Sequence, residues 1–261
     1  AFIPGILAAT GYMIVVSIYV RVSPGSAGQR ERAPYSERFK ALAEVWPVLL
    51  VFIVVIGGIY AGWFTPTEGA AVGAAGTGII ALINGGLTWR TLVEAILQTA
   101  VATALIFFIV YGAAFYNSFL ALSQLPQQLA TWVSAQGFNP WLVLTAILFA
   151  YLIFGCVMDS LSMILLTIPI FFPIVSALDY GLSPTEFAIW FGILVLIVVE
   201  VGLITPPVGV GAFVVAGAAK EVPIEQVFRG IVPFVFLELL TVALIFAFPA
   251  IALWLPQQMV N

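Results

Sequence analysis

The sequence is poor in charge and in the residues that soluble enzymes use. Only 8% of its 261 residues are charged, whereas an average soluble domain has about 25%. The chain contains no histidine and a single cysteine, Cys156. These absences exclude a secreted disulfide scaffold and a nucleic-acid-binding protein. They also argue against zinc, haem and Ser-His-Asp chemistry, and so against an enzyme.

Long apolar runs take the place of charge. Hydrophobic residues make up 63% of the chain, and several runs approach the roughly 20 residues that cross a hydrocarbon layer about 30 Å thick. The sequence therefore predicts an all-α, polytopic membrane protein in a lipid bilayer. The runs fall at residues 3–20, 45–63, 69–83, 95–116, 141–157, 161–177, 187–219 and 231–255.

The basic residues predict how the chain is oriented. All eight can be placed on one side of the membrane, which the positive-inside rule assigns to the cytoplasm. They are Arg21, Arg30, Arg32, Arg38, Lys40, Arg90, Lys220 and Arg229. We interpret residues 1–20 as a span, 21–44 as a cytoplasmic linker and 231–255 as the last span. Residues 45–137 are predicted to hold further spans, followed by an interfacial helix at 119–137.

Residues 141–177 are predicted to form a re-entrant hairpin, although two full spans would also fit the orientation. The turn between the two arms, GCVMDS at 155–160, has no Lys or Arg, which a cytoplasmic loop would usually carry. Asp159, Ser160 and Ser162 offer the oxygen ligands that hard cations such as sodium prefer. Asp159 can equally serve as the N-cap of the second arm, and both roles stay open.

The sequence GLITPPVG at 202–209 lies inside the apolar run 187–219, which is too long for one ordinary span. Pro206 and Pro207 remove two amide donors, so a broken helix is predicted. In transporters, such breaks place carbonyl oxygens on sodium and helix N-termini on anionic groups. We therefore favour a binding role for the break, and for Thr205 within it, over a simple kink.

Two short segments predict helix starts, TPTE at 65–68 and SPTE at 183–186. Each offers a hydroxyl at the N-cap, Pro at N1 and Glu at N3, which is a capping box. Thr65, Thr67 and Glu68 are also possible site residues, because a glycine-rich, closely packing run follows them.

Two further acids, Glu200 and Glu238, fall inside apolar runs. An ionisable group is costly there, so a functional role is the default interpretation. Glu200 precedes Thr205 by little more than one helical turn and is a possible proton carrier.

Five stretches together resemble the large membrane subunit of TRAP transporters, the DctM-like family. They are Pro4-Gly5, GGIYAGWFTPTEGAAVGA (57–74), GCVMDSLSMILLTIPIFFPIV (155–175), VGLITPPVGVGAF (201–213) and LWLP (253–256). The resemblance covers nearly the whole chain. It implies a multi-pass transporter of the bacterial inner membrane that imports an organic acid with sodium by an elevator motion. Na⁺ would be the coupling ion, and no other cofactor is implied.

The resemblance also implies partners. Family members consist of two inverted repeats, each with a re-entrant hairpin and a broken helix, and this sequence resembles the second repeat. Because the sequence opens at Ala1 without an initiator Met or a signal peptide, we expect residue 1 to be a break within a longer protein. The expected partners are the missing N-terminal repeat, a four-helix DctQ-like subunit and a periplasmic DctP-like binding protein.

The resemblance further implies that the hairpin tip (155–162) and the helix break (205–208) line a sodium site and half of a substrate pocket. The residues concerned are Gly155, Asp159, Ser160, Gly202, Thr205 and Gly209, and our candidate site adds Ser162, Pro206 and Pro207. Sodium would be held by Ser160, Thr205 and backbone carbonyls near Gly155 and Gly202.

A proton-coupled organic-anion transporter of a related elevator fold is the alternative, with Glu200 or Asp159 titrating. The permease of an ATP-driven pump is disfavoured, because the predicted cytoplasmic linker has no conspicuous apolar face for coupling.

Overall fold

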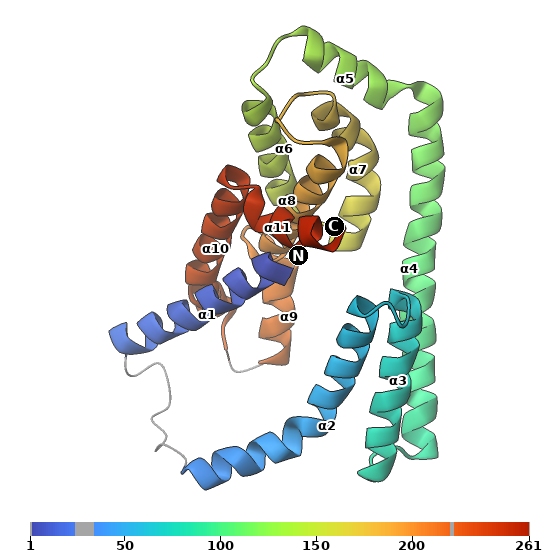
Figure 1. The fold of residues 1–261 in the computed structure, drawn as a ribbon, viewed down its shortest axis with the longest axis vertical. Helices are drawn as coiled ribbons and strands as arrows, with labels where there is room; N and C mark the ends of the chain where they lie inside the picture. Colours follow the sequence, from blue (N-terminus) through green and yellow to red (C-terminus); the bar gives the residue numbers. More distant parts are fainter. Residues whose placement is uncertain (1, 24–33, 220–221, 261) are drawn as a thin grey trace. The chain divides into compact units, whose positions relative to one another are not determined.

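The computed structural model describes residues 2–23, 34–219 and 222–260, and no strand occurs in these ranges. Five of the described helices are long and apolar enough to cross a membrane, or six if α2, which bends, counts as one span. The predicted all-α, multi-pass fold is confirmed (Figure 1). The helices are α1 (Phe2–Val22), α2 (Tyr35–Tyr60), α3 (Pro66–Ile83), α4 (Trp89–Ser123), α5 (Leu125–Ala135), α6 (Pro140–Gly155), α7 (Ser160–Ser176), α8 (Pro184–Ile204), α9 (Val210–Ala218), α10 (Ile224–Ala247) and α11 (Ala250–Val260).

Part of the predicted cytoplasmic linker at 21–44 is helical. Helix α1 continues to Val22, and α2 begins at Tyr35, so the second half of the predicted linker contains helix. Residues 36–40 include good helix formers, and Glu37 lies in the first turn, where a negative charge favours a helix. The rest of the predicted linker, residues 24–33, lies outside the described ranges.

Two other predicted segments have different bounds. Helix α4 runs on to Ser123, and only then does Gln124, with a left-handed φ of 55°, separate it from α5. The predicted interfacial helix at 119–137 is therefore shorter. The run 231–255 is divided, because the backbone leaves the helical region at Phe248 before Pro249 and α11 starts afterwards.

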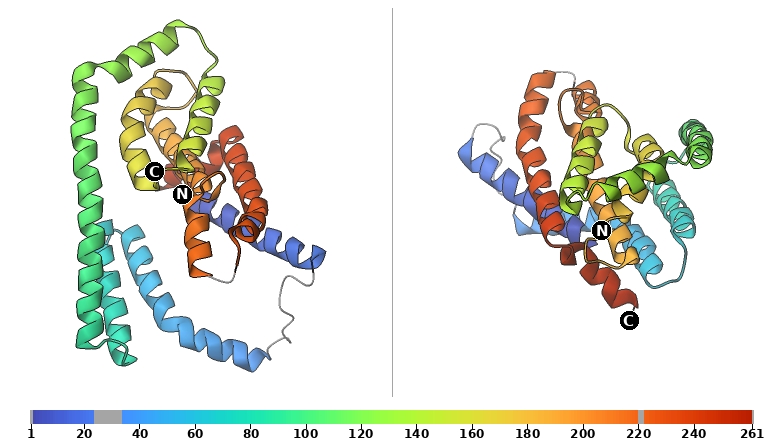
Figure 2. Two further views of the ribbon diagram at one scale, coloured as in Figure 1. Left: turned by 180° about the vertical axis from the view of Figure 1, so that it is seen from behind. Right: turned by 90° about the horizontal axis from the view of Figure 1, so that it is seen from above.

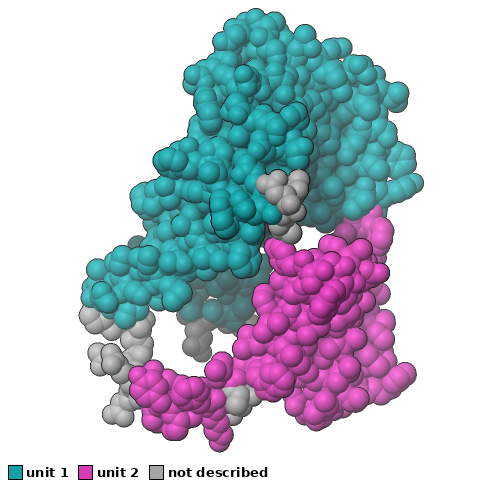
Figure 3. All heavy atoms as spheres, in the orientation of Figure 1, with its two compact units in different colours: residues 1–27, 108–261 teal, residues 28–107 magenta. Residues whose placement is uncertain are grey.

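The chain divides into two compact units (Figure 3), of which the smaller comprises residues 28–107. In this unit α3 packs on α2 through glycines. A Cβ atom on Gly69 would lie 2.9 Å from the Ile59 side chain, and one on Gly76 would lie 3.0 Å from the Val51 side chain. The predicted close packing is confirmed at these positions, but at Gly78 a Cβ would meet nothing within 4 Å.

The larger unit, residues 1–27 and 108–261, surrounds helix α8 (Figure 2). Helix α8 packs against α6, α7, α9, α10 and α11, and outside its first turn and Glu200 it is apolar, as a largely buried helix must be. Trp190 of α8 is fully buried, and its indole N–H donates a hydrogen bond to the Ile245 carbonyl (2.8 Å). This packing fixes α8 in the unit and thereby positions its C-terminal end, where the candidate site lies.

Candidate functional site

The turn of the hairpin lies between α6 and α7, and Asp159 caps α7. The backbone N–H of Ser162 donates to Asp159 Oδ2 at 2.9 Å, so one of the unpaired amides at the start of the helix is satisfied. The capping role of Asp159 is confirmed. The carboxylate remains exposed, so the cap leaves it accessible to an ion, and that second role stays a prediction.

The predicted break is present, since α8 ends at Ile204 and α9 begins at Val210. Pro206 and Pro207 have no N–H to offer the carbonyls of Gly202 and Leu203, four residues earlier. The Thr205 amide bonds to the Gly202 carbonyl instead (3.0 Å). The Thr205 hydroxyl donates to the Val201 carbonyl (2.5 Å). The Leu203 carbonyl therefore has no helical amide to accept from.

Gly155 and Gly202 bring the backbones of α6 and α8 into direct contact. A Cβ atom on Gly202 would lie 2.7 Å from Gly155 Cα and 2.9 Å from the Leu152 carbonyl oxygen. A Cβ atom on Gly155 would lie 3.0 Å from both Gly202 Cα and the Val199 carbonyl oxygen. Because backbone atoms cannot move aside as a flexible side chain can, both positions require glycine.

Cys156 connects the hairpin turn to the helix break. Its carbonyl accepts a hydrogen bond from the Gly209 amide (3.2 Å). Its thiol lies 3.2 Å from the Leu152 carbonyl oxygen of its own helix and 3.6 Å from the Pro206 carbonyl oxygen. Gly209 has a φ of 58°, a left-handed conformation that glycine adopts without strain. Cys156 was not among the predicted site residues, although its position beside Gly155 was the available signal.

Ser160 joins the start of α7 to α8. Its hydroxyl donates to Glu200 Oε1 at 2.8 Å. The sequence predicts Glu200 only as a possible site residue, and in the structure it is bonded to one of the predicted sodium ligands. The structure thus brings Gly155, Ser160, Glu200 and Gly202 together around one end of α8.

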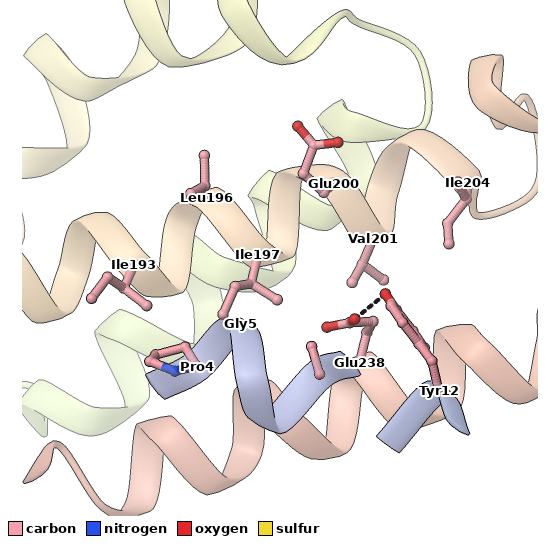
Figure 4. A pocket seen from close by; sticks show the side chains of 11 residues that line it. Pro4, Gly5, Tyr12, Ile193, Leu196, Ile197, Glu200, Val201, Ile204 and Glu238 are labelled. Carbon is pink, nitrogen blue, oxygen red and sulfur yellow. Dashed lines mark hydrogen bonds between the residues drawn. The ribbon is translucent and has the colours of Figure 1, made fainter. Parts of the chain in front are cut away.

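Glu238, the second acid inside an apolar run, has a different hydrogen-bond partner. It lines a cavity of about 380 Å³ between α1, α8 and α10, and the Tyr12 hydroxyl donates to its carboxylate. Figure 4 shows the carboxylate of Glu200 pointing away from this pair. Glu238 is only 7% exposed. Glu200 lines the same cavity, but its carboxylate bonds to Ser160, so the two acids of this cavity have different hydrogen-bond partners.

Both predicted capping boxes are confirmed. Glu68 accepts from the Thr65 amide (2.8 Å), and Glu186 accepts from the Ser183 amide (3.0 Å). Gln257 also donates to Glu186 (2.7 Å). Thr65, Thr67 and Glu68 belong to the unit of residues 28–107, so their part in the site stays a prediction.

The donor atoms around the break are of the kinds that bind a hard cation. No group of three or more His, Cys, Asp or Glu that could hold a metal ion occurs in the described ranges. The groups that the tip and the break bring together are hydroxyls, backbone carbonyls and carboxylates. Oxygen atoms of these kinds are the ligands that hard cations prefer.

Comparison with known proteins identifies a family. The sequence model described as "Tripartite ATP-independent periplasmic transporter, DctM component" matches residues 1–251. The chain is 34% identical over 258 residues to the C4-dicarboxylate TRAP transporter large permease protein DctM of Pseudomonas aeruginosa, covering 98% of this chain and 58% of that protein.

Relatives with other named solutes are similar to a comparable degree. Identity is 32% over 260 residues to the sialic acid TRAP transporter large permease protein SiaM of Vibrio cholerae, covering 98% of this chain and 58% of that protein. It is 31% over 258 residues to the ectoine TRAP transporter large permease protein TeaC of Halomonas elongata, covering 97% and 57%. The chain therefore spans less than two thirds of the length of these relatives.

Proposed function

The chain belongs to the DctM family of tripartite ATP-independent periplasmic transporters, and on that premise we propose that it forms part of a permease for sodium-coupled uptake of a small carboxylate. The permease would lie in the bacterial inner membrane. Its partners would be a further repeat of the same permease, a DctQ-like membrane subunit and a DctP-like periplasmic binding protein. The substrate class follows the printed names of relatives, of which two concern acids.

The observation that carries this proposal is the joined hairpin tip and helix break. The Gly155–Gly202 contact and the bond from the Gly209 amide to the Cys156 carbonyl hold the two together. Around them lie oxygen atoms of Ser160, Thr205 and the last carbonyls of α8. The C-terminal end of α8 carries a partial negative charge, which favours a cation.

The same geometry offers a site for an anion. Helices α7 and α9 both begin at this place, and the amides of a helix N-terminus attract a carboxylate. In the proposed mechanism, sodium binds to oxygens of the tip and the break and orders both. The ordered N-termini of α7 and α9 then bind the substrate carboxylate, and the assembly moves as a rigid body to release both on the other side.

The test is uptake into proteoliposomes that contain the full-length permease, its small membrane subunit and the loaded binding protein. An inward sodium gradient is expected to drive uptake, and Thr205→Val is expected to reduce it about 10- to 150-fold, the range for losing one bond to a charged group. Thr99→Val is the matched control, because the Thr99 hydroxyl bonds only to the Ala95 carbonyl of its own helix (2.8 Å) among the bonds described. Uptake that is unchanged without sodium, or unchanged in Thr205→Val, rejects sodium coupling at this site.

Asp159→Asn separates the two roles of Asp159. Asparagine caps helices as well as aspartate does, so a loss of uptake in this variant reports the missing charge. Uptake equal to that of the unaltered permease would leave Asp159 with its capping role alone.

Proton coupling is the second candidate, and the Ser160–Glu200 hydrogen bond favours it. That bond brings a carboxylate against the candidate site within an apolar helix, where an ionisable group indicates a functional role by default. In the same vesicles, a proton gradient would then drive uptake without sodium, and Glu200→Gln would abolish the response. Sodium-driven uptake that persists in Glu200→Gln excludes this candidate.

A further inference from the structure

Proline in α7 leaves a carbonyl group without its helical donor. The carbonyl of Leu165 would accept from the amide of residue 169 in a regular helix, but residue 169 is proline and has no N–H. A donor comes from another helix instead. The side-chain Nδ2 of Asn117, on α4, donates to the Leu165 carbonyl in a long hydrogen bond of 3.5 Å.

Asn117 lies on the buried face of α4. Ala113 and Leu120 share this face at helical spacing and are 4% and 3% exposed. The neighbouring Ser118 is exposed, and its hydroxyl bonds to its own helix at the Ala114 carbonyl (2.8 Å). No Cα atom of α4 lies within 8 Å of one of α7, so the two helices meet through side chains such as Asn117. Asn117 is thus a polar residue within an apolar contact face.

The Asn117 side chain is itself incompletely satisfied. Its Oδ1 atom is a buried polar atom without a hydrogen-bond partner in the part of the chain that the structure describes. An unpaired buried acceptor is unfavourable, and an apolar residue of similar shape would avoid it. The amide side chain of Asn117 is therefore explained by the Leu165 carbonyl, which needs a donor.

We propose that Asn117 is a positioning residue of the transporter, which replaces the hydrogen bond that Pro169 removes and so holds the second hairpin arm against α4. Leu165 lies about one and a half helical turns after Ser160, so the bond fixes α7 close to the hairpin tip. The inference rests on the proposed function, because it assigns Asn117 a consequence for sodium binding at that tip. Loss of the bond weakens the alignment of Ser160 and Asp159.

The test uses the full permease complex and a rescue variant. Asn117→Leu preserves the side-chain volume and removes the donor. We expect the half-saturating sodium concentration to rise about 2- to 10-fold, the factor for one neutral hydrogen bond, with little change in the maximal rate. In Asn117→Leu/Pro169→Ala the new amide at residue 169 bonds to Leu165 within the helix, so sodium affinity is expected to return.

Pro173→Ala provides the matched control for the rescue. It removes the other proline of α7 but supplies an amide to residue 169 and none to Leu165. Asn117→Leu/Pro173→Ala is therefore expected to remain impaired, and Ser118→Ala is expected to behave as the unaltered protein. Should Asn117→Leu not fold, Asn117→Ala carries the same comparison. Unchanged sodium affinity in the folded variant, or equal rescue by both proline substitutions, overturns the proposal.

Hydrogen exchange of the α7 backbone separates this proposal from the proposed function. Exchange around residues 166–170 is expected to be faster in Asn117→Leu and to slow again with Pro169→Ala. If the unaltered complex shows no sodium dependence, the proposed function fails, and this measurement alone decides the role of Asn117. Exchange that does not respond to Asn117→Leu rejects the role whatever the transport result.

Discussion

At the candidate site, two glycines place backbone directly against backbone. The atoms that a Cβ would meet at Gly202 belong to the main chain of α6, at 2.7 to 2.9 Å. A rotamer change cannot relieve such a clash, so the two helices would have to separate. Separation would also disturb the nearby hydrogen bond between Cys156 and Gly209.

We predict that Gly202→Ala destabilises the folded protein by about 1–3 kcal/mol, as over-packing of a close contact does. Gly192→Ala is the control on the same helix, because a Cβ there meets nothing within 4 Å. Since alanine favours a helix over glycine by about 1 kcal/mol, Gly192→Ala is expected to be neutral or stabilising. Thermal unfolding in detergent measures both, and equal midpoints for the two variants would contradict the prediction.

Some site residues were predictable and others were not, because some of their contacts join residues close together in the sequence and others join residues far apart. The capping of α7 by Asp159 and the box at Ser183 follow from neighbours three residues away. The roles of Cys156 and Asn117 depend on contacts with residues about 50 positions away. Local sequence rules contain no information on such contacts.

At the scale of helices, the proline pair defines the boundary between α8 and α9. Two alanines at these positions would offer helical amides to the carbonyls of Gly202 and Leu203, of which the first now accepts from Thr205 and the second has no helical donor. The helix could then continue, and those oxygens would be bonded within it and no longer available to the proposed sodium ion.

We therefore predict that Pro206→Ala/Pro207→Ala lowers sodium-driven uptake by about ten-fold or more, because each lost oxygen ligand costs on the order of 1–3 kcal/mol. Pro233→Ala, which replaces a proline inside α10, is the control and is expected to retain uptake. Circular dichroism should show that the double variant stays helical. Full activity of the double variant would mean that the break is structural only.

Helix existence was easier to predict than helix length. Prolines 206 and 207 stop a helix by removing donors, and this local effect made the break predictable. The bounds of α2 and the division before Pro249 were missed. Apolar runs locate membrane segments, but polar helix formers such as those at 36–40 extend a helix beyond its apolar part.

At the scale of the whole molecule, the distribution of basic residues predicts a topology that the fold alone does not define. The loop after α3, near Arg90, would face the cytoplasm, and the loop between α7 and α8 would face the periplasm. Asn84 and Asp179 are exposed residues in these two loops. They provide one reporter position for each side of the membrane.

In a full-length permease without other cysteines, we predict that Asp179→Cys reacts with a membrane-impermeant maleimide added from the periplasmic side. Asn84→Cys should react only after the inner membrane has been opened. Gel-shift of the labelled protein measures both. The reverse pattern would invert the orientation, and labelling of both from outside would refute the assignment of all eight basic residues to one side.

Helix α4 is so long that its tilt depends on the thickness of the bilayer. Its 35 residues extend about 52 Å at 1.5 Å per residue, well beyond a hydrocarbon layer of about 30 Å. The helix must therefore tilt strongly or project from the bilayer, and longer lipid tails would let it stand more upright. Asn117 of the same helix donates a hydrogen bond to Leu165 of α7. A change in acyl-chain length that alters the tilt of α4 is therefore expected to shift the second arm of the hairpin as well.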